Sequence, residues 1–224
     1  MINKEMLAER EKLALELAAK LPEISAAQSV GEGTCPLQWC LKLVEDARAM
    51  SDGKSVMSRD GLWQLQLMIE AATRGQSGEE DLAVYKETLD AMELIGDAFT
   101  EKVAALLKAN LETYASEWDL HVRRNRCTSL VCYYDLYIDP AVCQGNGACL
   151  KAAPSGAVLG GVGMISVIKN DRELKNDAFI ASCPLGAIKK CGAIKPPCPP
   201  APVPVGSFGN AAGGAAGGRR RRRG

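Results

Sequence analysis

Three cysteines in the second half of the chain constrain its fold more than any other feature. Cys143 and Cys149 are separated by five residues, two of them glycines, and Cys183 follows much later, directly before Pro184. The chain has nine cysteines, so at least one cannot form a disulfide within it. In a reducing compartment, metal binding explains such cysteines better than disulfides do. These cysteines are therefore candidate metal ligands.

The surrounding segment, residues 138–188, resembles a bacterial two-cluster ferredoxin. In that family a C-x2-C-x2-C-x3-C-P run occurs twice, and the fourth cysteine of each run ligates the cluster of the other run. On this frame, the first run falls on Cys143, Asn146, Cys149 and Ala153. The second run falls on Glu173, Asn176, Phe179 and Cys183.

The exchange of fourth ligands implies one iron–sulfur centre at most. Cys143, Cys149 and Cys183 share one site, with Asn146 in its fourth corner. The other site consists of Glu173, Asn176, Phe179 and Ala153, which cannot hold an iron cluster. Three thiolates suit a [3Fe–4S] cluster, or a [4Fe–4S] cluster with a non-cysteine ligand on the fourth iron. The alternative is a decayed module in which the same cysteines are buried free thiols.

Hydrophobic spacing predicts that the first half is helical and that the fold class is α+β. An N-terminal helix and linker are expected over 1–36 and a four-helix-type bundle over 37–120, with helices at 37–50, 60–74, 79–94 and 98–120. Trp39, Trp63 and Trp118 lie at apolar helical positions, which predicts core packing. We expect a linker at 121–132, a ferredoxin-like domain at 133–194 and a disordered tail at 195–224, because that tail is rich in Pro, Gly and Arg.

The helical half carries a second family pattern. Ser51-Asp52-Gly53-Lys54-Ser55 precedes Ser58-Arg59-Asp60-Gly61, and Leu94-Ile95-Gly96-Asp97 follows. This order resembles the C-terminal bundle of the flavin- and NADH-binding subunit of complex I and of NAD-linked or electron-bifurcating hydrogenases. There the motif is S-C-G-K-C-x-x-C-R-E-G, with a fourth cysteine before L-G-D. The corresponding positions here are Asp52, Ser55, Ser58 and Glu93, so the resemblance implies that the bundle cluster is lost. No flavin domain is present, so neither an FMN nor an NAD site is expected.

A separate metal site is predicted in the linker. His121, Cys127 and Cys132 have the ligand types and the spacing of a structural zinc site. Cys191 is a candidate for the fourth ligand, whereas Cys35 and Cys40 are expected to have no metal role, since Cys40 fits a helical apolar pattern. The alternative is an exposed histidine with two buried thiols.

Charge and motifs exclude several functions. The chain has 27 basic and 27 acidic residues, but five of the basic residues form the run Arg219–Arg223, which leaves the rest mildly acidic. The mildly acidic remainder of the chain gives no electrostatic reason to expect nucleic-acid binding. The arginine run itself is expected to be a solvated tail. No apolar run reaches the length needed to span a membrane, and a cytoplasmic location is the default expectation. A P-loop and a dinucleotide-binding glycine motif are both missing.

These observations predict an accessory electron-transfer subunit with no active site of its own. It would carry one iron–sulfur cluster, and zinc in the linker, and would bind the other subunits of a larger soluble oxidoreductase. The alternative is a cluster-free docking subunit of such a complex.

Overall fold

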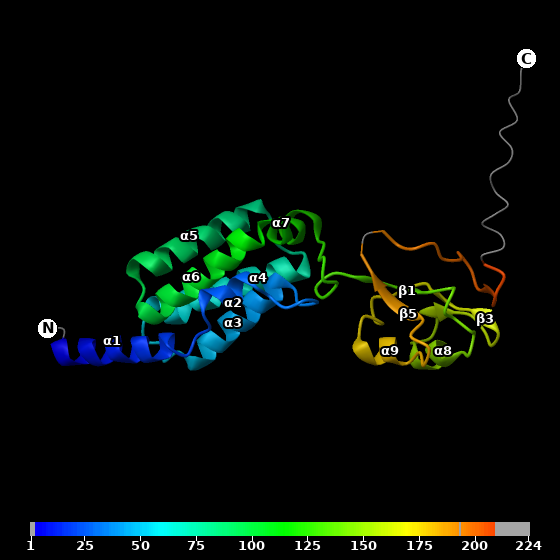
Figure 1. The fold of residues 1–224 in the computed structure, drawn as a ribbon, viewed down its shortest axis with the longest axis horizontal. Helices are drawn as coiled ribbons and strands as arrows, with labels where there is room; N and C mark the ends of the chain where they lie inside the picture. Colours follow the sequence, from blue (N-terminus) through cyan, green and yellow to red (C-terminus); the bar gives the residue numbers. More distant parts are fainter. Residues whose placement is uncertain (1–2, 193, 209–224) are drawn as a thin grey trace, which may run out of the picture. The chain divides into compact units, whose positions relative to one another are not determined.

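The computed structural model describes residues 3–192 and 194–208, and these form two compact units (Figure 1). The first unit comprises residues 1–133 and the second residues 134–224. The first is helical, and the second combines short helices with short antiparallel strand pairs. The predicted α+β class is confirmed.

The helical unit contains α1 to α7 and one π-helical turn, η1. The bounds are α1 (Lys4–Ala18), α2 (Ile24–Gln28), α3 (Pro36–Met50), η1 (Met57–Gly61), α4 (Leu62–Arg74), α5 (Glu79–Ile95), α6 (Ala98–Thr113) and α7 (Ala115–Arg124). The predicted helices at 37–50, 60–74 and 79–94 therefore correspond closely to α3, α4 and α5.

Local sequence explains where several helices begin and end. Pro36 occupies the first turn of α3, where its missing N–H costs no hydrogen bond. Asp97 accepts a hydrogen bond from the Thr100 N–H and so caps α6. Gly75 ends α4 with a positive φ of 71°, a conformation that glycine adopts without steric cost.

The predicted helix 98–120 is divided in two at Tyr114. This residue has non-helical angles (φ −111°, ψ 33°) between α6 and α7. Its hydroxyl donates to the carbonyl of Gln28, the last residue of α2, and accepts from the Val30 N–H just after that helix. Long-range bonds thus compensate for the interrupted helix, which apolar periodicity alone does not reveal.

The core of the helical unit is apolar but contains one buried polar network. Trp118 stacks against Tyr85 with ring centroids 4.8 Å apart, and its indole N–H donates to the Asn110 side chain. Asn110 is fully buried and donates in turn to the Ala27 carbonyl. This network ties α2, α6 and α7 together. Trp118 packs as predicted, but Trp63 is 52% exposed, so its predicted place in the core is wrong.

The second unit contains three two-stranded antiparallel pairs and two short helices. The pairs are β1 (Asp135–Ile138) with β5 (Ile188–Cys191), β2 (Val158–Leu159) with β4 (Val167–Ile168), and β3 (Met164–Ile165) with β6 (Val203–Pro204). The helices are α8 (Ala148–Ala152) and α9 (Asp177–Ala181). An apolar cluster that includes Leu136, Leu174 and Phe179 fills this unit.

The first part of the predicted disordered tail is structured, which corrects that expectation for residues 195–208. Val203 pairs with Ile165, and the Val205 N–H donates to the Gly163 carbonyl. The proline-rich composition predicts disorder for this segment, but pairing with β3 gives it backbone hydrogen bonds. Residues 209–224, including the run Arg219–Arg223, lie outside the described residues. Within the described ranges, no helix combines the length and the apolar character that crossing a membrane requires.

Candidate metal centres

Four potential metal ligands gather in the helical unit: Cys35, His121, Cys127 and Cys132. Their ligand atoms all lie within 4.8 Å of one another. His121 comes from the last turn of α7, and Cys35 caps the N-terminus of α3. Cys127 and Cys132 come from the loop after α7, whose first residue, Asn125, has a positive φ of 49°. Two helix ends and one loop therefore converge.

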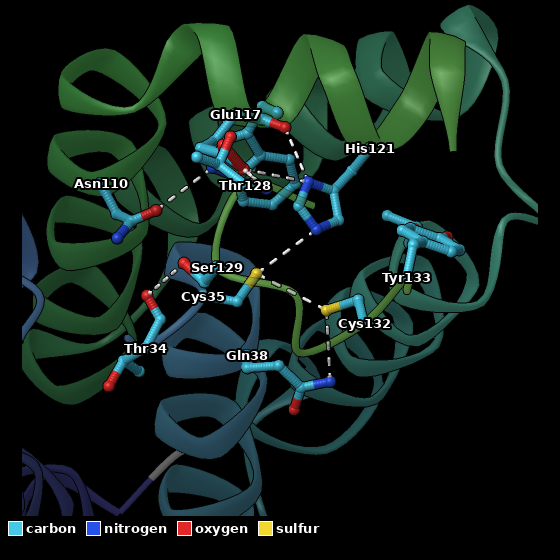
Figure 2. Close-up of polar contacts among 12 residues, drawn as sticks. Thr34, Cys35, Gln38, Asn110, Glu117, His121, Thr128, Ser129, Cys132 and Tyr133 are labelled. Atoms are coloured by element: carbon cyan, nitrogen blue, oxygen red, sulfur yellow. Dashed lines mark hydrogen bonds and ion pairs between the residues drawn. The ribbon is translucent and has the colours of Figure 1, made fainter. Parts of the chain in front are cut away.

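The imidazole of His121 is oriented to present one nitrogen to the thiols. Its Nδ1 lies 2.8 Å from the Glu117 carbonyl oxygen. Because a carbonyl can only accept, Nδ1 carries a proton, and Nε2 is the nitrogen that faces the thiols. Nε2 lies 3.3 Å from Cys35 Sγ, which in turn lies 3.5 Å from Cys132 Sγ (Figure 2). A backbone bond that fixes the second nitrogen is the usual support of a metal-ligating histidine.

Neighbouring polar groups hold the loop against the helices. The Gln38 amide of α3 donates to Cys132 Sγ over 3.7 Å, and the Ser129 hydroxyl donates to the Thr34 carbonyl (Figure 2). The Tyr133 ring lies 5.6 Å from the His121 ring, and its hydroxyl donates to the Ala72 carbonyl. Buried ligands with such supporting bonds form a closed site, typical of structural rather than catalytic zinc.

Three of these groups, His121, Cys127 and Cys132, have shifted pKa values. Burial lowers the pKa of His121, but hydrogen bonds with Cys127 and Cys35 raise it, and the net result is a rise to about 10. Hydrogen bonds from Cys132 and then Cys35 lower the pKa of the Cys127 thiol, while the bond to Cys127 raises the pKa of Cys132. The imidazole and the thiols thus share protons through these hydrogen bonds. A divalent cation would replace these shared protons.

Sequence reasoning found three members of this group and missed the fourth. His121, Cys127 and Cys132 lie together, but their partner is Cys35 and not Cys191, which belongs to β5 in the second unit. Cys35, for which no metal role was expected, thus joins the group of candidate ligands. Cys40, by contrast, is fully buried in the core of the helical unit. The useful signal was position: Cys35 precedes the proline that starts α3, whereas Cys40 is inside that helix.

The second unit brings Cys143, Cys149 and Cys183 to one cavity. All three line it, together with Gly145, Asn146, Gly147 and Ser166. The Ala187 N–H, also at the cavity, donates to Cys183 Sγ over 3.4 Å. The cavity volume of about 10 Å³ is that of one water molecule. Within the described residues, these three thiols are not among the side chains whose ligand atoms gather closely enough to hold one metal ion.

The glycine loop between Cys143 and Cys149 is fixed by its own backbone. Gly145 and Gly147 have positive φ values of 66° and 76°. A Cβ on Gly145 would come within 2.6 Å of the Met164 nitrogen, so the close approach of residues 163–164 requires glycine there. Asn146, in the predicted fourth corner, accepts a hydrogen bond from the Ala148 N–H. Its side-chain oxygen is therefore engaged at the start of α8.

The residues at the positions predicted for the second ferredoxin site pack in the apolar cluster or cap a helix. Phe179 is 3% exposed within the apolar cluster, and Ala153 packs against that cluster. Asn176 caps α9 by accepting from the Phe179 N–H, and it donates to the Glu173 carbonyl. Side chains fill this half of the module.

The bundle-cluster positions are likewise bonded to one another or to other groups. The Ser58 hydroxyl donates to the Ser55 carbonyl, and Asp52 accepts from the Lys54 N–H. Asp52, Ser55 and Ser58 line a small cavity together with Leu13 and other residues of α1. Glu93 does not line that cavity, and its carboxylate lies 2.6 Å from the Lys108 ammonium.

Comparison with known proteins gives only weak similarity. No family model matches the chain. It is similar to the NADP-reducing hydrogenase subunit HndC of Solidesulfovibrio fructosivorans, with 28% identity over 114 residues. The match covers 48% of this chain and 23% of that subunit, so the chain spans about a quarter of the length of its relative. The similarity suggests a relation to that hydrogenase subunit.

Proposed function

We propose that this protein is an accessory electron-transfer subunit of a larger oxidoreductase complex of the hydrogenase or NADH-dehydrogenase type. The observation that carries the proposal is that Cys143, Cys149 and Cys183, distant in sequence, line one cavity. The similarity to a subunit of an NADP-reducing hydrogenase supports the same class. Other subunits of that complex would be its partners.

The three thiolates would hold one iron–sulfur cluster, which accepts one electron from a reduced partner and passes it to an oxidised one. Three soft sulfur ligands and a backbone N–H directed at Cys183 Sγ suit such a group. Since the Asn146 side-chain oxygen already accepts from the Ala148 N–H, the fourth corner would have no protein ligand. This favours a [3Fe–4S] cluster, or a [4Fe–4S] cluster with an exogenous fourth ligand.

The four ligands of the helical unit would bind a structural zinc ion. Three cysteines and one histidine within 4.8 Å match a Cys3His site. The ion would join the start of α3 to the end of α7 and the loop after it. It would have no role in electron transfer, because zinc has no accessible redox chemistry.

Metal analysis tests both assignments. Purified protein, reconstituted anaerobically with iron and sulfide, should bind three or four irons per chain, as the two cluster types require, and one zinc. Cys183→Ala should lose the iron, while Cys198→Ala, a matched change of a half-buried thiol that does not line the cavity, should keep it. Equal iron in both variants would refute the cluster assignment.

The alternative is a docking subunit without any cluster. The observation in its favour is that three of the four bundle-cluster positions, Asp52, Ser55 and Ser58, now make local hydrogen bonds. A protein that has replaced one set of ligands in this way retains its helical surfaces. Reconstituted protein with zinc but no iron or sulfide would select this function.

A further inference from the structure

One buried hydroxyl in the second unit has no assigned role. Ser166 lies between β3 and β4 and is 2% exposed. Its Oγ is buried and has no hydrogen-bond partner, and no other buried side-chain nitrogen or oxygen in the described part of that unit lacks one. Burying a hydroxyl without a partner is unfavourable, so such an atom calls for an explanation.

The position of Ser166 points to a ligand. It lines the same cavity as Cys143, Cys149 and Cys183. Unlike Asn146, whose oxygen is engaged with the Ala148 N–H, Ser166 has its donor and acceptor both unused. A serine hydroxyl is a hydrogen-bond donor, and sulfur atoms of a cluster and of its thiolates accept hydrogen bonds.

The backbone next to Ser166 leaves space for this hydroxyl. A Cβ on Gly160 would lie 2.5 Å from Ser166 Oγ and 3.0 Å from its Cβ. Glycine at 160 thus permits β2 and the segment after it to pass close to the serine. The side chain is therefore enclosed on that side and keeps its place in the wall of the cavity.

We propose that the Ser166 hydroxyl donates a hydrogen bond to a sulfur of the iron–sulfur centre held by the three cysteines, and thereby raises its reduction potential. The inference rests on the proposed function. Reduction adds negative charge to the centre, so a donor stabilises the reduced form more than the oxidised form. Ser166 is a tuning residue and not a fourth ligand, since the hard oxygen of serine is a poor match for iron in a sulfur cluster.

The test is the midpoint potential of reconstituted protein in a redox titration followed by EPR. Ser166→Ala should keep the wild-type iron content and shift the potential to a more negative value. A tenfold change in the redox equilibrium corresponds to about 59 mV for a one-electron couple, and we expect a shift of roughly this size. ENDOR spectra should also lose one exchangeable proton coupled to the cluster.

Ser77→Ala is the matched control. Ser77 Oγ is also buried and unpartnered, but it belongs to the helical unit, so this variant should leave the potential unchanged. Wild-type potential and proton couplings in Ser166→Ala would overturn the inference, as would loss of iron, which would make Ser166 a ligand or a structural residue. Wild-type protein without iron would overturn the proposed function itself, a result distinct from either.

Discussion

The two groups of thiols in this molecule are built in different ways. In the helical unit, four ligand atoms lie within 4.8 Å of one another, on two helix ends and the loop after α7, beside a large apolar core. In the second unit, three thiols line a cavity formed mainly by loops and very short elements. Packing of the helices holds the ligand atoms of the first group close together. The second group has less support from regular structure, so a bound cluster would have to hold its thiols in place. The difference predicts that the two metals stabilise the protein independently and are lost separately.

Removing zinc should have the largest effect on stability. A ligand that binds only the folded state at one thousand times its Kd stabilises that state by about 4 kcal/mol. Chelation, or Cys35→Ser, should therefore lower the melting temperature of the helical unit markedly, while the iron content stays unchanged. Calorimetry and metal analysis check this. Cys40→Ala is the control: its thiol is buried in the same core outside the ligand group, so it should retain zinc.

Cys183→Ala should have the complementary effect. Because all three thiolates are needed for one cluster, we expect this variant to lose its iron and sulfide. Its zinc content and the melting of the helical unit should equal those of the wild type, because the zinc ligands belong to the other unit. Loss of zinc together with iron would contradict the comparison, since the two sites would then be coupled.

Asn110→Ala tests whether packing alone preorganises the zinc ligands. The substitution leaves the buried Trp118 N–H and the Ala27 carbonyl without their partner. An unsatisfied buried group costs about 1–3 kcal/mol, so the free energy of unfolding should fall by roughly that amount. Zinc-loaded and zinc-free protein should lose the same free energy in denaturant titrations. A loss confined to the zinc-loaded form would show that Asn110 acts through the metal site.

The sequence predicted individual helices better than it predicted which distant segments come together. Apolar periodicity located α3, α4 and α5, because helix formation depends on neighbours three and four residues apart. It did not divide α6 from α7, since the break at Tyr114 is compensated by hydrogen bonds to Gln28 and Val30. Composition also gave a wrong prediction of disorder for β6, because this proline-rich segment is ordered by pairing with β3.

The candidate sites show the same limit. Spacing identified His121, Cys127 and Cys132, which are close in sequence. Cys35 is 86 residues from His121 along the chain, and only the packing of α3 beside α7 brings it near. The role of Ser166 had no sequence signal at all, since an unpartnered hydroxyl is visible only once its surroundings are known.

Phe179→Leu should have the smallest effect, and it tests the asymmetry within the second unit. Phe179 stands at a ligand position of the second ferredoxin site but is buried in the apolar cluster. Exchange for another apolar side chain of similar size usually costs less than 1.5 kcal/mol. The iron content should be unchanged, because this position does not line the cavity of Cys143, Cys149 and Cys183. Iron loss at unchanged thermal stability would instead mean that both halves of the module share the cluster, and the ligand exchange inferred from the ferredoxin frame would be wrong.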